Sequence, residues 1–318
     1  MIAQFFFLLQ IVLPVFAVMA VGYLTRRLNV LSSEADRSLT RLVVTLLLPC
    51  LALNTIIGNE SLKEPENCLL PPLLGFGCIA LGIVVSRLAA KVFRITQDDS
   101  VRTFVFTTSI QNAGYIPIPL CSSLFGDDAT GVLFAFILGV DLAFWSIAIW
   151  QLVGRRGGNA WRQLLSPPTI AITAGLVLNG LGANAWMPAA IGTTIAALAG
   201  CAIPLALLLS GALIADHVNL DSLRHGSRTI LASAVVRIGI LPLLILLFTK
   251  IAPLDTAIKS VLVIEAAMPA AILPIVVTKV HQGDMDTALQ VVLGTSLIGL
   301  VTIPLWISFG LHWIIPGW

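Results

Sequence analysis

The sequence predicts an all-α membrane protein with ten transmembrane helices, arranged as two inverted repeats of five helices each. Three observations support this prediction: an apolar composition, ten apolar runs of membrane-spanning length, and an internal repeat that contains two broken helices. Of the 318 residues, 58% are hydrophobic and 11% are charged, and the mean hydropathy is +0.98. Because a soluble domain carries about 25% charged residues, we expect a protein of the lipid bilayer.

Each of the ten runs has about 20 mainly apolar residues, which is the length that crosses the hydrocarbon core. The runs cover residues 5–24, 39–57, 69–91, 101–124, 130–152, 168–184, 188–214, 229–250, 257–280 and 287–315. No soluble domain separates them. We therefore predict a multi-pass protein of the cell membrane, with a first five-helix repeat at 1–153, a cytoplasmic connecting loop at 154–167 and a second five-helix repeat at 168–318.

Basic residues are concentrated in the loops that follow the odd-numbered runs. These loops and their flanks hold Arg26, Arg27, Arg37, Arg41, Lys91, Arg94, Arg102, Arg155, Arg156, Arg162, Arg224, Arg228 and Lys279. The loops after the even-numbered runs hold or adjoin only Lys63, Lys250 and Lys259. The positive-inside rule then makes the odd loops cytoplasmic and places both termini on the extracytoplasmic side.

The fourth run contains residues that break a helix at membrane depth. Pro117 and Pro119 lack a backbone N–H, and each would cost about 3 kcal/mol in an ordinary helix interior. Gly114 weakens the helix further, and Gln111 and Asn112 bring amides that need partners. Non-helical backbone survives in the membrane only where protein or a water-filled cavity covers it, so this break is a candidate binding site.

An internal repeat relates this break to a second one. A single shift along the chain places Asp98 on Asp255 and Pro117 on Pro274, and it places Gly126-Asp127-x-x-Thr130 on Gly283-Asp284-x-x-Thr287. The second break is Glu265-Ala266-Ala267-Met268-Pro269-Ala270-Ala271-Ile272-Leu273-Pro274, again with two prolines. Units of five spans have opposite orientations, and interrupted helices at corresponding positions indicate the site of a secondary transporter.

At these motifs the chain resembles the auxin efflux carrier family, which includes plant PIN-type auxin exporters and bacterial malonate-type transporters. The resemblance covers nearly the whole length. It is carried by Leu13-Pro14-Val15-Phe16, Leu48-Pro49-Cys50-Leu51, Asn112-Ala113-Gly114-Tyr115-x-Pro117-x-Pro119 and Glu265-Ala266-Ala267-Met268-Pro269-Ala270. It implies that helices 4 and 9 cross at their proline breaks, that an organic anion binds beside the crossover, and that the protein is a homodimer with an elevator-like movement. A long central cytoplasmic loop, typical of the plant branch, is absent here, which favours a bacterial organic-anion carrier.

Asn112 is the first candidate for a substrate contact, because its amide can donate to a carboxylate at the break. Alternatively, Asn112 caps the helix that follows the break. Gln111, Gly114 and Tyr115 complete the expected substrate-binding set, although Gln111 could instead face neighbouring helices. Pro117, Pro119, Pro269 and Pro274 are expected to hold the two breaks open and so to act through the geometry of the crossover.

Three ionisable residues lie inside apolar runs and are candidates for coupling or ion pairing. Asp141 is near the middle of the fifth run, where a charge costs about 2.5–3.5 kcal/mol or more, so it could carry a proton, bind a coupling cation or form a structural pair. Glu265 and Arg237 are expected to form an intramembrane ion pair. The other possibilities are a proton-carrying Glu265, and an Arg237 that either binds the anion or extends to the surface.

The sequence predicts a small organic anion and the bilayer as partners, and no cofactor, metal or nucleic acid. The cysteines lack metal-ligand spacing, zinc-protease and serine-hydrolase motifs are absent, and a net charge of +2 gives no nucleic-acid-binding patch. We therefore predict no enzymatic activity. The alternatives are a Na⁺-coupled bile-acid-type symporter or cation/proton antiporter, and a membrane signalling or scaffold protein. Coupling to H⁺ is favoured over Na⁺ because the second break is mainly alanine and proline.

Overall fold

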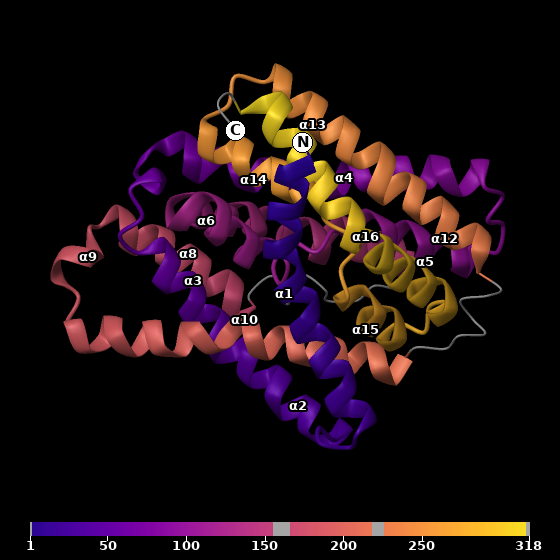
Figure 1. Cartoon of the computed structure of the whole chain (residues 1–318), viewed down its shortest axis with the longest axis horizontal. Coiled ribbons are helices and arrows are strands. Elements are labelled where there is room, and N and C mark those ends of the chain that lie inside the picture. The colour runs from indigo at the N-terminus through magenta and orange to yellow at the C-terminus, as the bar shows by residue number, and fades with distance from the viewer. Residues whose placement is uncertain (1, 155–165, 218–225, 316–318) are drawn as a thin grey trace.

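The computed structural model describes residues 2–154, 166–217 and 226–315, and these residues form helices joined by short segments (Figure 1). Within these ranges, the only β-type pairing is an isolated bridge between Gln111 and Ala270. Most of the predicted connecting loop 154–167, including Arg155, Arg156 and Arg162, lies outside the described residues, as does Arg224. The predicted all-α membrane fold is confirmed for the described part of the chain.

The described helices follow the apolar runs closely. They are α1 (Ile2–Arg27), α2 (Ser33–Leu42), α3 (Leu48–Ile56), α4 (Pro65–Val92), α5 (Asp98–Ser109), α6 (Pro117–Ala143), α7 (Ile149–Val153), α8 (Pro167–Gly180), α9 (Ala183–Trp186), α10 (Ala189–His217), α12 (Ser227–Ala234), α13 (Leu241–Ile251), α14 (Thr256–Ala266), α15 (Leu273–Val280) and α16 (Met285–Ile314). The π-helical segments Val43–Leu47, Phe144–Ala148 and Val235–Ile240 join α2 to α3, α6 to α7 and α12 to α13.

Seven helical stretches of the described chain are long and apolar enough to cross a membrane. They cover residues 4–27, 33–56, 65–92, 117–153, 189–217, 227–251 and 285–314. The other three predicted spans are interrupted or short. Run 101–124 is divided between α5 and the start of α6, run 257–280 between α14 and α15, and run 168–184 between α8 and α9. Because the breaks divide two spans into short helices, the count of ten stays a prediction.

The helices pack in two groups. In the first, α10 packs against α1 and α3, and α3 packs against α8; in the second, α4, α5, α6 and α12 to α16 surround one another. Close pairs within each group depend on glycine. A Cβ on Gly211 of α10 would collide with the Met19 carbonyl of α1, and one on Gly139 of α6 with the Pro72 carbonyl of α4. These pairs therefore approach at backbone distance, as small residues allow in membrane helices.

The start of the first described helix, α1, contacts the last part of the last described helix, α16. Ser308 of α16 donates a hydrogen bond to the Gln4 side chain of α1, with 3.2 Å between the oxygen atoms. Figure 1 shows both chain ends at the same edge of the molecule. Which side faces the cytoplasm is predicted by the distribution of charge alone.

Helices α5 and α14 lie in the interior of the second group. Thr103 to Ser109 of α5 and Ser260 to Ala266 of α14 are continuously buried. Both helices stop inside the molecule and both are followed by a non-helical segment, residues 110–116 after α5 and 267–272 after α14. We call these segments the first break and the second break.

Candidate functional site

The first break begins after Ser109 and ends where Pro117 opens α6. Proline is well suited to the first turn of a helix, because the N–H that it lacks has no partner within the helix there. In the second break, α14 ends at Ala266 and Pro274 lies in the first turn of α15. Pro117 and Pro274, which the repeat aligns, therefore play the same local role. The prediction of two broken helices is confirmed.

The two breaks pair with each other through their backbones. The Asn112 N–H donates to the Pro269 carbonyl and the Ala271 N–H donates to the Ile110 carbonyl, both at 2.9 Å. Gln111 and Ala270 face each other in this short antiparallel bridge. The pairing satisfies backbone groups that would otherwise cost several kcal/mol each in a dry interior. The sequence indicated each break but gave no direct sign of this pairing.

A threonine that the sequence did not single out fixes the second break. The Ala270 N–H donates to the hydroxyl of Thr295 on α16, at 3.2 Å, and that hydroxyl donates to the Val291 carbonyl at 2.7 Å. Thr295 is fully buried. Its only sequence signal is its position in Leu293-Gly294-Thr295-Ser296-Leu297, which a shift two residues shorter than that of the breaks aligns with Leu138-Gly139-Val140-Asp141-Leu142.

The Asn112 side chain remains available at the first break. It is 6% exposed, and no hydrogen bond joins its amide to another described residue. It does not cap α6, because the N-cap position is Ile116 and carries no side-chain cap. The alternative role of Asn112 as a helix cap is therefore wrong. Its backbone holds the bridge while its amide stays free to donate.

Gly114 and Tyr115 lie on the open side of the first break. A Cβ built on Gly114 would meet no atom within 4 Å. Tyr115 lines a cavity of about 530 Å³ together with Ile272 of the second break and Leu273, the first residue of α15. Pro119 lies one turn inside α6, where it is half-buried. The two breaks therefore share one cavity.

Gln111 is 1% exposed and does not line this cavity. It neighbours Glu265 of α14, whose charge also acts on Arg237. Glu265 is 0% exposed and Arg237 1% exposed, and the side-chain polar atoms of all three residues lack a hydrogen-bond partner among the described residues. The structure thus gathers Gln111, Arg237 and Glu265 into a buried polar cluster beside the bridge.

Two expectations for this cluster need correction. Arg237 and Glu265 do not form the predicted direct ion pair, because the guanidinium and carboxylate groups are neighbours without a contact at hydrogen-bonding distance. Arg237 also does not extend to the surface, since its side chain is enclosed where the π-helical segment 235–240 joins α12 to α13. Both charges therefore stay inside the protein next to the break.

Asp141 lies at the contact between α6 and α8, close enough to Tyr115 of the first break for its charge to act on the Tyr115 side chain. Its carboxylate accepts a hydrogen bond from the Thr169 hydroxyl at 3.1 Å, and the Thr169 hydroxyl also lies 2.7 Å from that of Ser166. Thr169 is a polar partner that the sequence analysis missed, because nothing in an apolar run indicates which helix faces another. Asp141 therefore connects the second helix group to the first.

The described residues contain no metal-type cluster. No group of three or more His, Cys, Asp or Glu side chains comes together within residues 2–154, 166–217 and 226–315. In the same ranges all five cysteines are free thiols. The chemistry that the site offers is therefore that of amide, carboxylate and guanidinium side chains.

Comparison with known proteins identifies the family. A family model described as membrane transport protein matches residues 7–160 and 158–307. The chain is 26% identical over 303 residues to an uncharacterized transporter of Methanothermobacter thermautotrophicus, covering 93% of this chain and 96% of the relative. It is 22% identical over 307 residues to an uncharacterized transporter of Methanocaldococcus jannaschii, covering 94% and 97%. The chain therefore belongs to the membrane transport protein family, as its resemblance to the auxin efflux carriers predicted.

Proposed function

We propose that this protein is a secondary active or facilitative transporter of small organic anions, such as malonate-like mono- or dicarboxylates or auxin-like acids. The observation that carries the proposal is the pairing of the two breaks, which leaves the Asn112 amide without a hydrogen-bond partner among the described residues, in a break whose Tyr115 lines a cavity. A rigid backbone crossing with one free donor is suited to binding a carboxylate and releasing it to either side. In this proposal the substrate binds at Asn112, Gly114 and Tyr115.

The magnitudes explain why a side-chain donor is needed. A helix N-terminus stabilises an anion by about 0.3–1 kcal/mol, and by about 2 kcal/mol in a favourable site. The starts of α6 and α15 together therefore barely match the cost of about 2.5–3.5 kcal/mol for one charge at the centre of a bilayer. A charge-assisted hydrogen bond from Asn112 adds about 1.5–3 kcal/mol. This makes Asn112 decisive for affinity.

The buried polar cluster is the proposed coupling site. Glu265 precedes the second break and has no hydrogen-bond partner among the described residues, so a proton on its carboxylate is a natural way to lower the cost of burial. Arg237 can then balance the ionised form. Asp141 is the second candidate for a coupled proton. Na⁺ coupling is the competing proposal, and it is less well supported because the second break offers few oxygen-bearing side chains.

The proposed architecture is that of two inverted five-helix units with ten spans and both termini outside. The similar construction of the two breaks supports it, as does the adjacency of the first and last described helices. Alternating access would then arise from an elevator-like movement of the second helix group past the first, within a homodimer. The bridge between the breaks lies wholly inside the second group, so this movement would leave it intact.

A ligand screen tests the proposal. Purified protein is heated with a panel of organic acids, at two pH values and with or without Na⁺, and each compound that stabilises the protein is then offered to proteoliposomes. A ligand at about 100 times its Kd stabilises the folded state by about 2.7 kcal/mol, which raises the Tm measurably. We expect a short mono- or dicarboxylate to raise the Tm and to be taken up. The proposal fails if no organic acid does either.

A further inference from the structure

The cavity of about 530 Å³ that reaches both breaks is also lined by two arginines. Tyr115 of the first break, Ile272 of the second and Leu273 of α15 line one part of it, and Arg37 and Arg41 of α2 line another. Its volume falls within the range of small-molecule sites, about 300–1,000 Å³. We call this cavity the arginine vestibule. It places two exposed arginines in the same cavity as one residue of each break.

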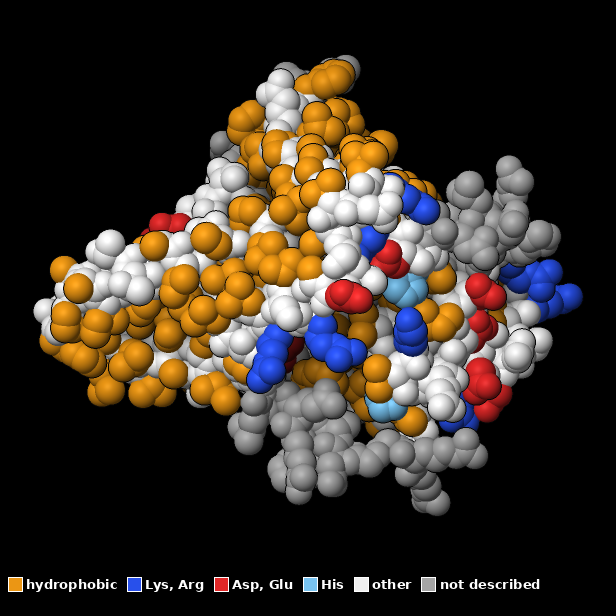
Figure 2. Space-filling model, turned by 90° about the horizontal axis from the view of Figure 1, so that it is seen from below, with side chains coloured by type: hydrophobic (Ala, Val, Ile, Leu, Met, Phe, Trp, Pro, Cys, Tyr) orange, Lys and Arg blue, Asp and Glu red, His pale blue; other side chains and the backbone are white. Residues whose placement is uncertain are grey.

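Arg37 and Arg41 lie one turn apart on α2, so both side chains project on the same face of the helix. Both are exposed, and neither guanidinium forms a hydrogen bond or ion pair with another described residue. Figure 2 shows Lys and Arg side chains gathered near the middle of the face seen from below, beside a broad hydrophobic surface. Asp, Glu and His side chains lie beside them in the same view, but the guanidinium groups of Arg37 and Arg41 are themselves unpaired among the described residues.

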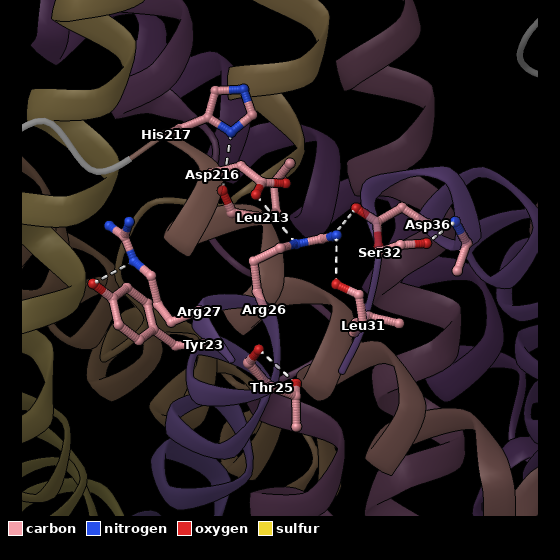
Figure 3. Close-up of polar contacts among 12 residues, drawn as sticks. Tyr23, Thr25, Arg26, Arg27, Leu31, Ser32, Asp36, Leu213, Asp216 and His217 are labelled. Carbon is pink, nitrogen blue, oxygen red and sulfur yellow. Dashed lines mark hydrogen bonds and ion pairs between the residues drawn. The ribbon is translucent and has the colours of Figure 1, made fainter. Parts of the chain in front are cut away.

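The one acidic residue among those lining the vestibule, Asp36, is engaged by Arg26 rather than by Arg37 or Arg41. Asp36 pairs with Arg26 at the end of α1, and the Arg26 guanidinium also forms an ion pair with Asp216 of α10 at 3.1 Å. Arg26 donates a further hydrogen bond to the Leu31 carbonyl at 2.9 Å, so it fixes the turn between α1 and α2 (Figure 3). This network holds α2 in place and directs the Asp36 carboxylate to Arg26. Because Arg26 pairs with both Asp36 and Asp216, the three side chains carry one net negative charge, against the two positive charges of Arg37 and Arg41.

The remaining lining matches the other end of an organic anion. Leu209 and Leu213 of α10 and Val276 of α15 give the vestibule an apolar wall, and Ser210 adds a hydroxyl. A guanidinium group can form a bidentate pair of hydrogen bonds with a carboxylate, while the apolar wall can contact a hydrocarbon chain. The lining is thus suited to an anion that carries both a carboxylate and an apolar part.

We infer that Arg37 and Arg41 form an anion-collecting site, at which a small organic carboxylate binds before it moves to the break at Tyr115. This inference deepens the proposed function and rests on it. The same guanidinium groups could also meet the phosphates of lipid headgroups, since basic residues near a membrane surface attract anionic lipids. We favour binding of the substrate, because the cavity that these arginines line also includes Tyr115 of the first break and Ile272 of the second.

The chain offers a matched control. Arg94 and Arg228 line a second surface hollow of about 420 Å³, together with Val92, Phe93, Ser227 and Leu231. That hollow also holds two arginines, but no residue of either break lines it. A double change of Arg94 and Arg228 to Gln removes the same charge as a double change of Arg37 and Arg41, without touching the vestibule.

The test compares R37Q/R41Q with R94Q/R228Q, using malonate as the probe. Malonate binding is measured in detergent by thermal shift, and uptake in proteoliposomes of neutral lipid or of neutral lipid with anionic phosphatidylserine. We expect R37Q/R41Q to weaken binding and raise the KM about 3- to 20-fold, with the rate at saturating malonate retained. Added NaCl should raise the KM of the unmodified protein and leave that of R37Q/R41Q nearly constant. R94Q/R228Q should behave as the unmodified protein does.

The outcomes separate the inference from the proposed function. If the unmodified protein takes up malonate and the two double variants behave alike, the vestibule site is refuted and transport stands. If malonate binds without uptake and only R37Q/R41Q weakens binding, the vestibule stands and transport of malonate fails. If R37Q/R41Q differs only in vesicles with phosphatidylserine, the arginines serve lipid headgroups and the inference is overturned. Absence of both binding and uptake of malonate overturns the inference as well.

Discussion

The two breaks have the same backbone design but different side chains. The first break carries Gln111, Asn112 and Tyr115, whereas residues 267–272 of the second are alanine, methionine, proline and isoleucine. The second break is fixed mainly through its backbone, by the Thr295 hydroxyl and the Ile110 carbonyl. The difference indicates that the two breaks have different roles: the first supplies side-chain hydrogen-bond donors, and the second fixes the geometry of the crossing. Four comparisons test this division of roles.

The largest expected effect is on uptake, from Asn112→Ala. Loss of a charge-assisted hydrogen bond worth about 1.5–3 kcal/mol should lower substrate uptake about 10- to 100-fold. The Tm should change little, because only the backbone of Asn112 takes part in the bridge. Asn67→Ala is the control for truncation of a buried asparagine outside both breaks; its amide donates to the Ser61 carbonyl at 3.0 Å and to the Asp255 carboxylate at 3.4 Å, so this change should lower the Tm but leave uptake by the folded protein intact. Uptake by Asn112→Ala at the rate of the control would show that the first break does not supply the chemistry.

Thr295→Val should act on stability and leave substrate recognition intact. It leaves the buried Ala270 N–H without its partner, which costs about 1–3 kcal/mol and should lower the Tm. Thr295→Ser keeps the hydroxyl and is expected to remain close to the unmodified protein. The measurements are thermal unfolding and the KM for uptake. A large rise in KM without a fall in Tm would place chemistry in the second break and contradict the division.

A pair of glycines compares how tightly the two breaks are packed. A Cβ on Gly82 of α4 would lie 2.8 Å from the Ser109 carbonyl oxygen at the start of the first break, so Gly82→Ala must displace backbone. We expect a loss of about 1–3 kcal/mol in the free energy of unfolding. Gly299→Ala places its Cβ 3.4 Å from the Pro269 Cβ, which is an ordinary contact, and should be neutral or stabilising. Equal effects on thermal unfolding would mean that both breaks are packed alike.

The segments that follow the breaks should differ in their response to pH. Asp284 caps α16: partial burial alone would raise its pKa, but hydrogen bonds from Ser100 and Thr287 bring it below the ordinary value of 3.8. The aligned Asp127 directly follows Gly126, whose φ of 77° kinks α6, but its side chain is exposed and forms no hydrogen bond with another described residue. Asp284→Asn should therefore cost about 0.5–1.5 kcal/mol, and Asp127→Asn less.

The sign of this effect follows from the lowered pKa. The contribution of ionised Asp284 is complete above pH 3.8 and is lost as the pH falls through the lower pKa of the folded state. The gap in Tm between the unmodified protein and Asp284→Asn should thus be wide at pH 6 and narrow near pH 3. A gap that widens towards acid would refute this account of the cap.

The sequence predicted the positions of both breaks because proline and glycine act locally, and Pro117 and Pro274 open helices as expected. It could not predict partners that depend on helix rotation. Thr295 and Thr169 are two of many threonines in apolar runs, and nothing local marks them as facing Ala270 and Asp141. The expected direct contact between Arg237 and Glu265 failed for the same reason, because proximity of helices does not fix the distance between side-chain ends.

The bridge between the breaks also sets an order of events during synthesis. Ile110 and Asn112 are made well before Pro269 and Ala271, with α6 to α13 inserted in between. Until α14 and α15 follow, the Asn112 N–H and the Ile110 carbonyl have no bridge partner and need water or another temporary partner at membrane depth. The nascent amino-terminal half therefore cannot settle into its final dry packing alone. Residues in the last third of the chain supply the backbone partners that the buried first break needs.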